Sequence, residues 1–181
     1  MGISAQATVI TFQENGSSVS LGSQSTFTVG GASLTAYASP GATLYAKNDG
    51  PGETGLGITS DPTGDHEIWG QTFVQILSST SGGFDVTSIN LGSVQSPDIA
   101  GIYFSAVQGV LGVQIGSILA DGSFAIASQY QNGYIGVAAV PGNVVLGAVT
   151  GFSSVPDGGT TVAMLGLGLT AVGLIRRKLS A

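Results

Sequence analysis

Hydrophobic and β-branched residues recur along most of this chain in short runs, separated by clusters of Gly, Ser, Asn, Asp and Pro. Within several runs apolar and polar residues alternate, as at Thr26, Phe27 and Thr28. A period of two is typical of a β-strand with one buried face. The Asp-Gly and Asn-Gly pairs that follow Ala120 and Gln131 are typical of tight hairpin turns. No window carries a helical stripe, so the pattern predicts an all-β fold.

The run boundaries predict eleven strands before residue 151. They lie near 8–12, 25–29, 32–38, 42–46, 72–77, 84–91, 100–106, 113–119, 123–129, 134–139 and 143–150. Many short strands with turn signals between them are typical of a two-sheet fold. We therefore predict one antiparallel β-sandwich, jelly-roll-like, over residues 8–152.

The C-terminal part follows a different pattern. Residues 160–175 are uncharged and almost wholly apolar or small. As a helix they would span about 24 Å, a little less than the hydrocarbon core of a bilayer at about 30 Å. A buried core helix is the alternative. A linker-like stretch at 153–159 and the cations Arg176, Arg177 and Lys178 flank the segment, and they favour a transmembrane helix with a basic cytoplasmic tail at 176–181.

Composition and charge exclude several classes of protein. The chain is 43% hydrophobic and only 8% charged, so it can bury a core and is not of the disordered class. It has no cysteine, which excludes disulfides and thiolate chemistry. Residues 1–155 contain one cation, Lys47, against nine acidic residues. Such a surface repels phosphates, so nucleic acid is excluded as a partner.

The first residues resemble the end of an export signal. Ala5, Gln6 and Ala7 fit the small-x-small pattern of a signal-peptidase site. We interpret residues 1–7 as the remnant of a signal peptide; an ordinary N-terminal extension is the alternative.

The tail carries a more specific pattern. Val155, Pro156 and Asp157, then two glycines, the apolar span and the basic triplet at 176–178 resemble the PEP-CTERM sorting domain in its Val-Pro-Asp variant. The usual Pro-Glu-Pro is replaced here by Pro-Asp-Gly. The resemblance implies that Val155, Pro156 and Asp157 are recognised by an exosortase, a membrane enzyme of which this chain would be a substrate. Arg176, Arg177 and Lys178 would stop the membrane anchor.

The same resemblance implies a location. Proteins with such tails are exported by exopolysaccharide-producing bacteria, so we expect an inner-membrane intermediate and then the cell surface or extracellular matrix. Exopolysaccharide is a further candidate partner. The body of the chain resembles, more weakly, β-rich ectodomains that precede such tails and mostly lack an assigned activity.

One segment is rich in acidic residues. Between residues 48 and 67 lie Asp49, Glu53, Asp61, Asp65 and Glu67. Calcium takes six to eight oxygen ligands, and a Gly-rich acidic loop can supply them. These five residues are the candidate calcium ligands, although the spacing is not that of an EF-hand. The alternative is a solvated loop whose Asp and Gly residues make turns.

Catalytic motifs are scarce. His66 is the only histidine, which excludes a His-rich zinc site, and no Gly-x-Ser-x-Gly motif is present. We interpret His66 as a loop residue paired with Asp65 or Glu67, and we predict that the chain is not an enzyme. Two alternatives stay open. Paired carboxylates of the 49–67 segment could hydrolyse a glycoside, or Trp69, Tyr130 and Tyr134 could stack on sugars in a carbohydrate-binding module.

Overall fold

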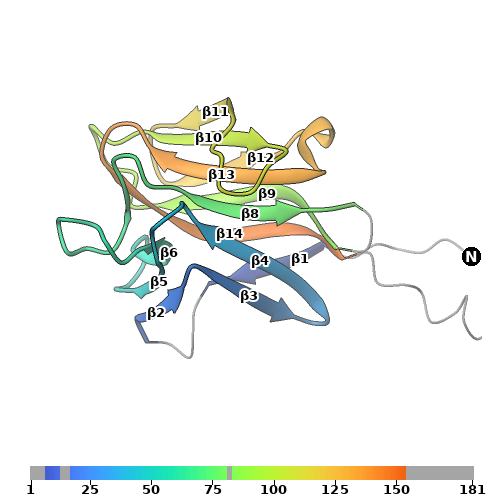
Figure 1. The fold of residues 1–181 in the computed structure, drawn as a ribbon, viewed down its shortest axis with the longest axis horizontal. Coiled ribbons are helices and arrows are strands. Elements are labelled where there is room, and N and C mark those ends of the chain that lie inside the picture. The colour runs from blue at the N-terminus through green and yellow to red at the C-terminus, as the bar shows by residue number, and fades with distance from the viewer. Residues whose placement is uncertain (1–6, 13–16, 81–82, 154–181) are drawn as a thin grey trace, which may run out of the picture.

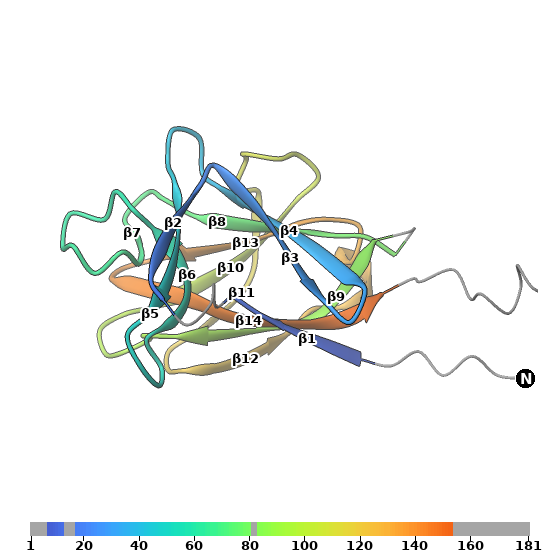
Figure 2. The same cartoon turned by 90° about the horizontal axis from the view of Figure 1, so that it is seen from below.

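A computed structural model describes residues 7–12, 17–80 and 83–153, and all its long elements are β-strands (Figure 1). The strands form two antiparallel sheets that pack face to face (Figures 1 and 2). This confirms the all-β antiparallel sandwich. The sorting motif, the apolar span 160–175 and the basic tail lie outside the described residues. Within the described part, no helix is long and apolar enough to cross a membrane.

The first sheet, here called sheet 1, has the strand order β12-β9-β14-β6-β5-β2, with β1 and β7 also paired to β14. Its strands are β1 (Ala7–Thr11), β2 (Val19–Gly22), β5 (Leu44–Asn48), β6 (Thr54–Ile58), β7 (Ile68–Trp69), β9 (Phe84–Gly92), β12 (Gly122–Ala125) and β14 (Asn143–Ser153).

The second sheet, sheet 2, has the order β11-β10-β13-β8-β4-β3. Its strands are β3 (Gln24–Val29), β4 (Ala32–Ala38), β8 (Val74–Ser78), β10 (Ala100–Ser105), β11 (Val113–Ile118) and β13 (Gly133–Ala139). From β8 to β10 and from β11 to β14 the chain changes sheet at every connection.

The core lies between the sheets, and period-two patterning builds it. In β4, Leu34, Ala36 and Ala38 are buried while the residues between them are not. Burying apolar surface stabilises the fold by about 25 cal/mol per Å². At one edge the sheets meet through Phe12, after β1, and Phe27 of β3, whose rings lie edge to face at 4.9 Å.

Strand β14 organises sheet 1. It spans eleven residues and pairs with β1, β6, β7 and β9. It ends at Ser153, immediately before the sorting motif begins in the sequence. The first described residue, Ala7, pairs with Phe152, so the described chain starts and stops at the same end of the sandwich (Figure 1).

All eleven predicted strands are present; β4 has the predicted ends, and the other strands differ at one end or both. The clearest shift is in the strand expected at 123–129, which ends at Ala125 and is followed by a 3-10 turn at Ser128–Tyr130. Three further strands, β2, β6 and β7, were not predicted. Strand β6 was not predicted from the sequence because glycine, here Gly55 and Gly57, has a low propensity for strands. Both are there for close packing: a Cβ at Gly55 would meet the Leu146 carbonyl, and one at Gly57 the His66 carbonyl.

Candidate functional site

The acidic segment is not a single loop, which corrects the sequence-based interpretation. Asp49 follows β5 and Glu53 precedes β6, so these two belong to a tight turn. Asp61, Asp65 and Glu67 lie on the connection from β6 to β7. The strand β6 therefore divides the five carboxylates into two groups.

Lys47 joins the two groups. Its side chain on β5 is buried, at 3% exposure, and its Nζ lies 2.6 Å from Glu53 Oε2 and 2.6 Å from Glu67 Oε1. Asp49 Oδ2 lies farther from Nζ, at 3.9 Å, and that side chain is largely exposed. A buried charge is costly unless it is paired. The single positive charge of Lys47 thus offsets part of the negative charge of Glu53 and Glu67.

Ser93, at the start of the connection between β9 and β10, completes this cluster. Its Oγ lies 2.7 Å from Glu67 Oε1 and 3.1 Å from Glu53 Oε1, within hydrogen-bond distance of both. Its backbone φ is 58°, in the left-handed region that a non-glycine residue enters at a cost of about 1–3 kcal/mol. We call Lys47, Glu53, Glu67 and Ser93 the lysine cluster.

The two glutamates have different electrostatic environments. Burial raises the pKa of Glu67, whose exposure is 2%, and outweighs its bonds to Lys47 and Ser93. The hydrogen bond from Lys47 lowers the pKa of the more exposed Glu53. Burial alone would lower the pKa of Lys47, but its bonds with both glutamates outweigh burial and raise that pKa. Burial and the shared lysine thus shift the pKa values of the two glutamates in opposite directions.

The lysine cluster forms one wall of a cavity of about 410 Å³. Glu53, Glu67 and Ser93 line it, and so do Asp65, Gln95, Ser96, Pro97, Asp98 and Asn143. The lining is therefore mostly oxygen and amide groups. It can offer hydrogen bonds to a polar ligand, and its net charge is negative.

An exposed aromatic residue is paired with one of the residues that line this cavity. Trp69 of β7 is directly opposite Asn143 of β14 in the antiparallel register, and paired residues project to the same side of a sheet. Trp69 is 41% exposed, whereas the neighbouring pair Ile68 and Val144 is fully buried. Trp69 therefore projects to the same side of the sheet as Asn143, although Trp69 itself does not line the cavity.

Asp61 is occupied by its own loop. Its Oδ1 accepts from the Thr63 backbone N–H at 3.0 Å, and its Oδ2 accepts from Thr63 Oγ1 at 2.5 Å and from the Glu67 N–H at 3.4 Å. Burial by itself would raise the pKa of Asp61, but these hydrogen bonds outweigh it and lower the pKa. Asp61 therefore orients the connection that carries Glu67.

His66 has a different role from the one expected. Its ring lies against Tyr45, with centroids 4.1 Å apart, and its Nδ1 is 3.2 Å from the Thr59 carbonyl. Its φ is 59°. The described contacts of the ring are thus with Tyr45 and Thr59 and not with the carboxylates of Asp65 or Glu67.

The calcium assignment stays a prediction. Glu53, Asp65 and Glu67 do share the cavity, but the ammonium group of Lys47 lies between the two glutamates. In the ranges that the structure covers, no group of three or more His, Asp or Glu side chains is placed to hold a metal ion. A bound cation would need the lysine cluster to rearrange.

The other aromatic candidates lie in sheet 2 and its connections. Tyr130 packs on Phe104, with centroids 5.2 Å apart, and contacts the core. Tyr134 of β13 meets Tyr37 of β4 edge to face at 5.8 Å. No ring contact among the described residues joins either tyrosine to Trp69, and each tyrosine packs instead on another aromatic ring.

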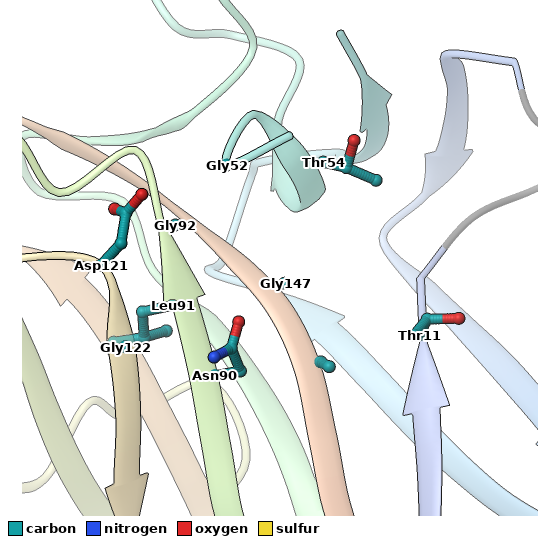
Figure 3. A pocket seen from close by; sticks show the side chains of 10 residues that line it. Thr11, Gly52, Thr54, Asn90, Leu91, Gly92, Asp121, Gly122 and Gly147 are labelled. Atoms are coloured by element: carbon teal, nitrogen blue, oxygen red, sulfur yellow. The ribbon is translucent and has the colours of Figure 1, made fainter. Parts of the chain in front are cut away.

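A second cavity, of about 460 Å³, lies over sheet 1 (Figure 3). Thr54, Asn90 and Asp121 stand around it, with Gly92 and Gly147 between them (Figure 3). Asp121 Oδ1 accepts a hydrogen bond from the Val94 N–H at 2.8 Å, and Asn90 Nδ2 donates to Ser123 Oγ at 3.2 Å. These polar groups are thus already used to hold the β9–β10 and β12 segments.

Sequence reasoning missed part of the first cavity. Ser93 and Asp98 come from the connection between β9 and β10, Asn143 is the first residue of β14, and no motif marks any of them. One signal was available in the sequence: Lys47 is the single cation among nine acidic residues in residues 1–155. A lysine that is buried needs acidic partners, so it indicates where carboxylates gather.

The comparisons with known proteins concern the tail. The described chain is an all-β body followed by a C-terminal segment of the sorting-signal type. Residues 154–179 match the family model of the VPDSG-CTERM motif, which is a PEP-CTERM-like variant of that signal. This confirms the resemblance, with Gly158 in place of the serine of the motif name. The motif indicates an exported protein that is sorted by an exosortase-type system. No curated protein and no solved structure matches the chain significantly.

Proposed function

We propose that this protein is a cell-surface or extracellular-matrix protein whose β-sandwich is exported, held transiently in the inner membrane by residues 160–175 and then released or transferred by an exosortase-type enzyme. The observation that carries the proposal is the VPDSG-CTERM match at residues 154–179. The match begins at the residue after the end of β14, and residues 154–159 would separate the sandwich from the membrane anchor. We assign no catalytic role to the sandwich.

The geometry of the sandwich supports this function. The tail leaves from the end at which β14 stops, whereas β5, β6 and β7, which carry the lysine cluster and Trp69, lie at the opposite end (Figures 1 and 2). A tether at Ser153 would therefore point the first cavity away from the membrane. The alternation of strands between sheets from β11 to β14 supports the jelly-roll-like character that we assign to the fold.

The test is processing of the full chain in cells with and without an exosortase-type enzyme. We expect a shortened product only when the enzyme is present, and we expect Pro156→Ala with Asp157→Ala to abolish it. Pro62→Ala, an exposed proline outside the motif, is the matched control and should be processed normally. A wild-type chain that keeps its full length, or a motif variant that is still shortened, would contradict the proposal.

A second candidate function is glycan binding at the first cavity, which would make the sandwich a carbohydrate-binding module. It is favoured by the position of Trp69 beside Asn143, because an exposed indole can stack on a sugar ring while amides and carboxylates bind its hydroxyls. Exopolysaccharide would be the natural ligand class. Glycoside hydrolysis is less well supported, since Glu67 is 2% exposed and already bonded to Lys47 and Ser93.

Glycan binding is tested on an array with the full chain, Trp69→Ala and Tyr130→Ala. Binding lost in Trp69→Ala and kept in Tyr130→Ala would support the cavity, and equal loss in both would contradict it. The array is run with calcium and with chelator, together with melting curves. A higher melting temperature in calcium, abolished by Asp61→Asn with Asp65→Asn, is expected if calcium binds; equal melting temperatures would exclude it.

A further inference from the structure

The sorting motif begins very close to a paired strand. Strand β14 ends at Ser153, and Val155 is the first of the residues that the enzyme is proposed to recognise. Val155 lies outside the described residues, but two residues of chain span at most about 7 Å. A single helix with its side chains is about 10–12 Å across. An enzyme that encloses Val155 with one such layer would therefore collide with the sandwich while Ser153 stays in its ladder.

The last residues of β14 are occupied on both edges. On one edge, Gly151 and Phe152 pair with residues 7–8 of β1. On the other edge Ser153 joins them, and all three pair with residues 84–86 of β9. A protein that binds an extended peptide through main-chain hydrogen bonds needs a free edge of that peptide. While both ladders are intact, the part of β14 next to the motif has no such edge.

A bulge separates this end from the rest of β14. Thr150 pairs with Ser88 and Gly151 with Val86, so Thr87 of β9 has no residue directly opposite it. Bulges interrupt a ladder locally. Sheet 1 is also narrow beyond the bulge, because in the described ranges β12 pairs with β9 only from Ser88 onward. The part of β14 beyond the bulge is thus a unit of its own.

This unit buries little side-chain surface. Gly151 has no side chain, and Phe152 and Ser153 are half-buried. The core cluster of the described residues includes Val149, which is fully buried, and does not include Phe152. Segments with few buried apolar contacts open locally at a lower free energy than the whole fold. Opening that begins at Ser153 should therefore stop before Val149.

A buried carboxylate favours opening at the same place. Asp85 of β9 lies directly opposite Phe152. Its Oδ1 is buried and has no hydrogen-bond partner among the described residues. An unpaired buried acceptor is unfavourable because it has lost its bonds to water. Separation of Phe152 from Asp85 would let water reach this oxygen and would offset part of the cost of breaking the ladder.

We propose that residues 151–153 are a releasable end of β14, which must leave β1 and β9 before the exosortase-type enzyme can bind the sorting motif. This inference rests on the proposed function and adds to it a control of processing by the fold. Once these residues are released, the chain from Thr150 to Val155 spans up to about 17 Å, enough to pass one layer of secondary structure. Their edges also become free for main-chain hydrogen bonds with the enzyme.

The absence of cysteine allows this end to be locked by a single disulfide. Asp85→Cys with Phe152→Cys places two cysteines directly opposite each other, where Cα atoms of antiparallel strands are about 4.5–5.5 Å apart and a disulfide fits. Val9→Cys with Thr150→Cys, also directly opposite, is the matched control, because it links β1 to β14 before the bulge and leaves residues 151–153 unlocked. Full chains are assayed in membranes that contain the exosortase-type enzyme, with and without a thiol reductant.

We expect the disulfide at Phe152 to abolish shortening of the chain and the reductant to restore it, whereas the disulfide at Thr150 has no effect. If the chain locked at Phe152 is shortened as fast as its reduced form, or if both locked chains lose shortening equally, the inference is overturned. A wild-type chain that keeps its full length would contradict the proposed function itself, and this inference with it.

A spacer distinguishes the reach of the motif from any other effect of the disulfide. A spacer of about six Gly and Ser residues, inserted between Ser153 and Ser154, lengthens the chain before the motif by up to about 20 Å. The chain locked at Phe152 should then be shortened without reductant at the rate of the wild type, because the motif reaches the enzyme without opening of β14. A locked chain that stays at full length despite the spacer would overturn the proposal.

Discussion

Lys47 shows how one residue can determine the arrangement of a whole acidic segment. Its Nζ holds Glu53 from one connection and Glu67 from another, each at 2.6 Å. Because the ammonium group is buried, each partner is needed to offset its loss of hydration. The lysine cluster therefore stabilises the fold, and three of its members, Glu53, Glu67 and Ser93, also line the first cavity.

Replacing Lys47 should be strongly destabilising. Lys47→Met leaves Glu67 buried with Ser93 as its remaining side-chain partner in the cluster, and breaking a buried pair costs about 3–5 kcal/mol. Chemical denaturation followed by circular dichroism measures the free energy of unfolding. Adding Glu53→Gln and Glu67→Gln to Lys47→Met should recover part of the loss, because no buried charge then lacks a partner. A single variant as stable as the wild type would show that the cluster does not contribute.

The raised pKa of Glu67 predicts a pH dependence. The pKa of Glu67 in the folded protein lies above its ordinary value of 4.5. Such a carboxyl group stabilises the fold fully at pH below 4.5. This stabilisation is lost as pH rises through the folded pKa. Glu67→Gln cannot titrate. The stability of the wild type should therefore fall relative to Glu67→Gln as pH rises above 4.5.

The measurement is the free energy of unfolding of both proteins across this range. The pH dependence from Glu53 runs the other way. Because its pKa is lowered in the folded protein, Glu53 stabilises the fold above its ordinary pKa, and this stabilisation is lost as pH falls through the folded pKa. Glu53→Gln is thus the matched control. Its free energy of unfolding should lack the decrease at acid pH that Glu53 causes in the wild type. Parallel curves for wild type and Glu67→Gln would contradict the assignment.

At the scale of elements, strand β6 determines where the site residues lie. Gly57 on β6 packs directly under the backbone of residues 66–67, so a Cβ there would overlap the His66 carbonyl. Gly147 on β14 has more room, since its nearest neighbours would be Asn90 Oδ1 at 3.2 Å and the Thr54 carbonyl at 3.4 Å. The two glycines therefore form a test pair.

Gly57→Ala should displace the connection that carries Glu67 and cost at least about 1–3 kcal/mol, the usual cost of overpacking. Gly147→Ala should cost less, because the side chain of Asn90 can move. Thermal unfolding ranks the two variants. Equal losses would show that β6 does not fix the position of this connection.

Elements were predictable where side chains carry the pattern. The alternation in β3 and β4 and the turn dipeptides before β12 and β13 located those strands, because one buried face imposes a period of two. β6 was not predictable, because Gly55 and Gly57 serve a backbone contact that arises only in the folded sheet. The site was predictable only in part for the same reason: Glu53 and Glu67 stand out in the sequence, whereas Ser93 and Asn143 reach the cavity through topology.

At the scale of the whole molecule, the proposed anchor gives a clear expectation. A charged residue at the centre of a membrane helix costs about 2.5–3.5 kcal/mol, so Leu167→Asp should release the chain from membranes. Flotation of membranes after cell lysis measures this, with Leu179→Asp, beyond the basic triplet, as the control that should stay bound. A wild-type chain recovered entirely in the aqueous fraction would exclude the anchor.

The position of β14 also determines how the sandwich would respond to mechanical load. Suppose that the tail is held and that force acts on the end of the sandwich opposite Ser153 (Figure 1). The force then acts along β14 and shears its pairings with β9 and β1 together. Many hydrogen bonds must therefore break at once. If force instead separates the two ends of the described chain, Ala7 leaves Phe152 first and β1 peels away one pair at a time. A domain tethered through β14 should thus be stiff under drag from its surroundings and weak only when its N-terminal strand is pulled.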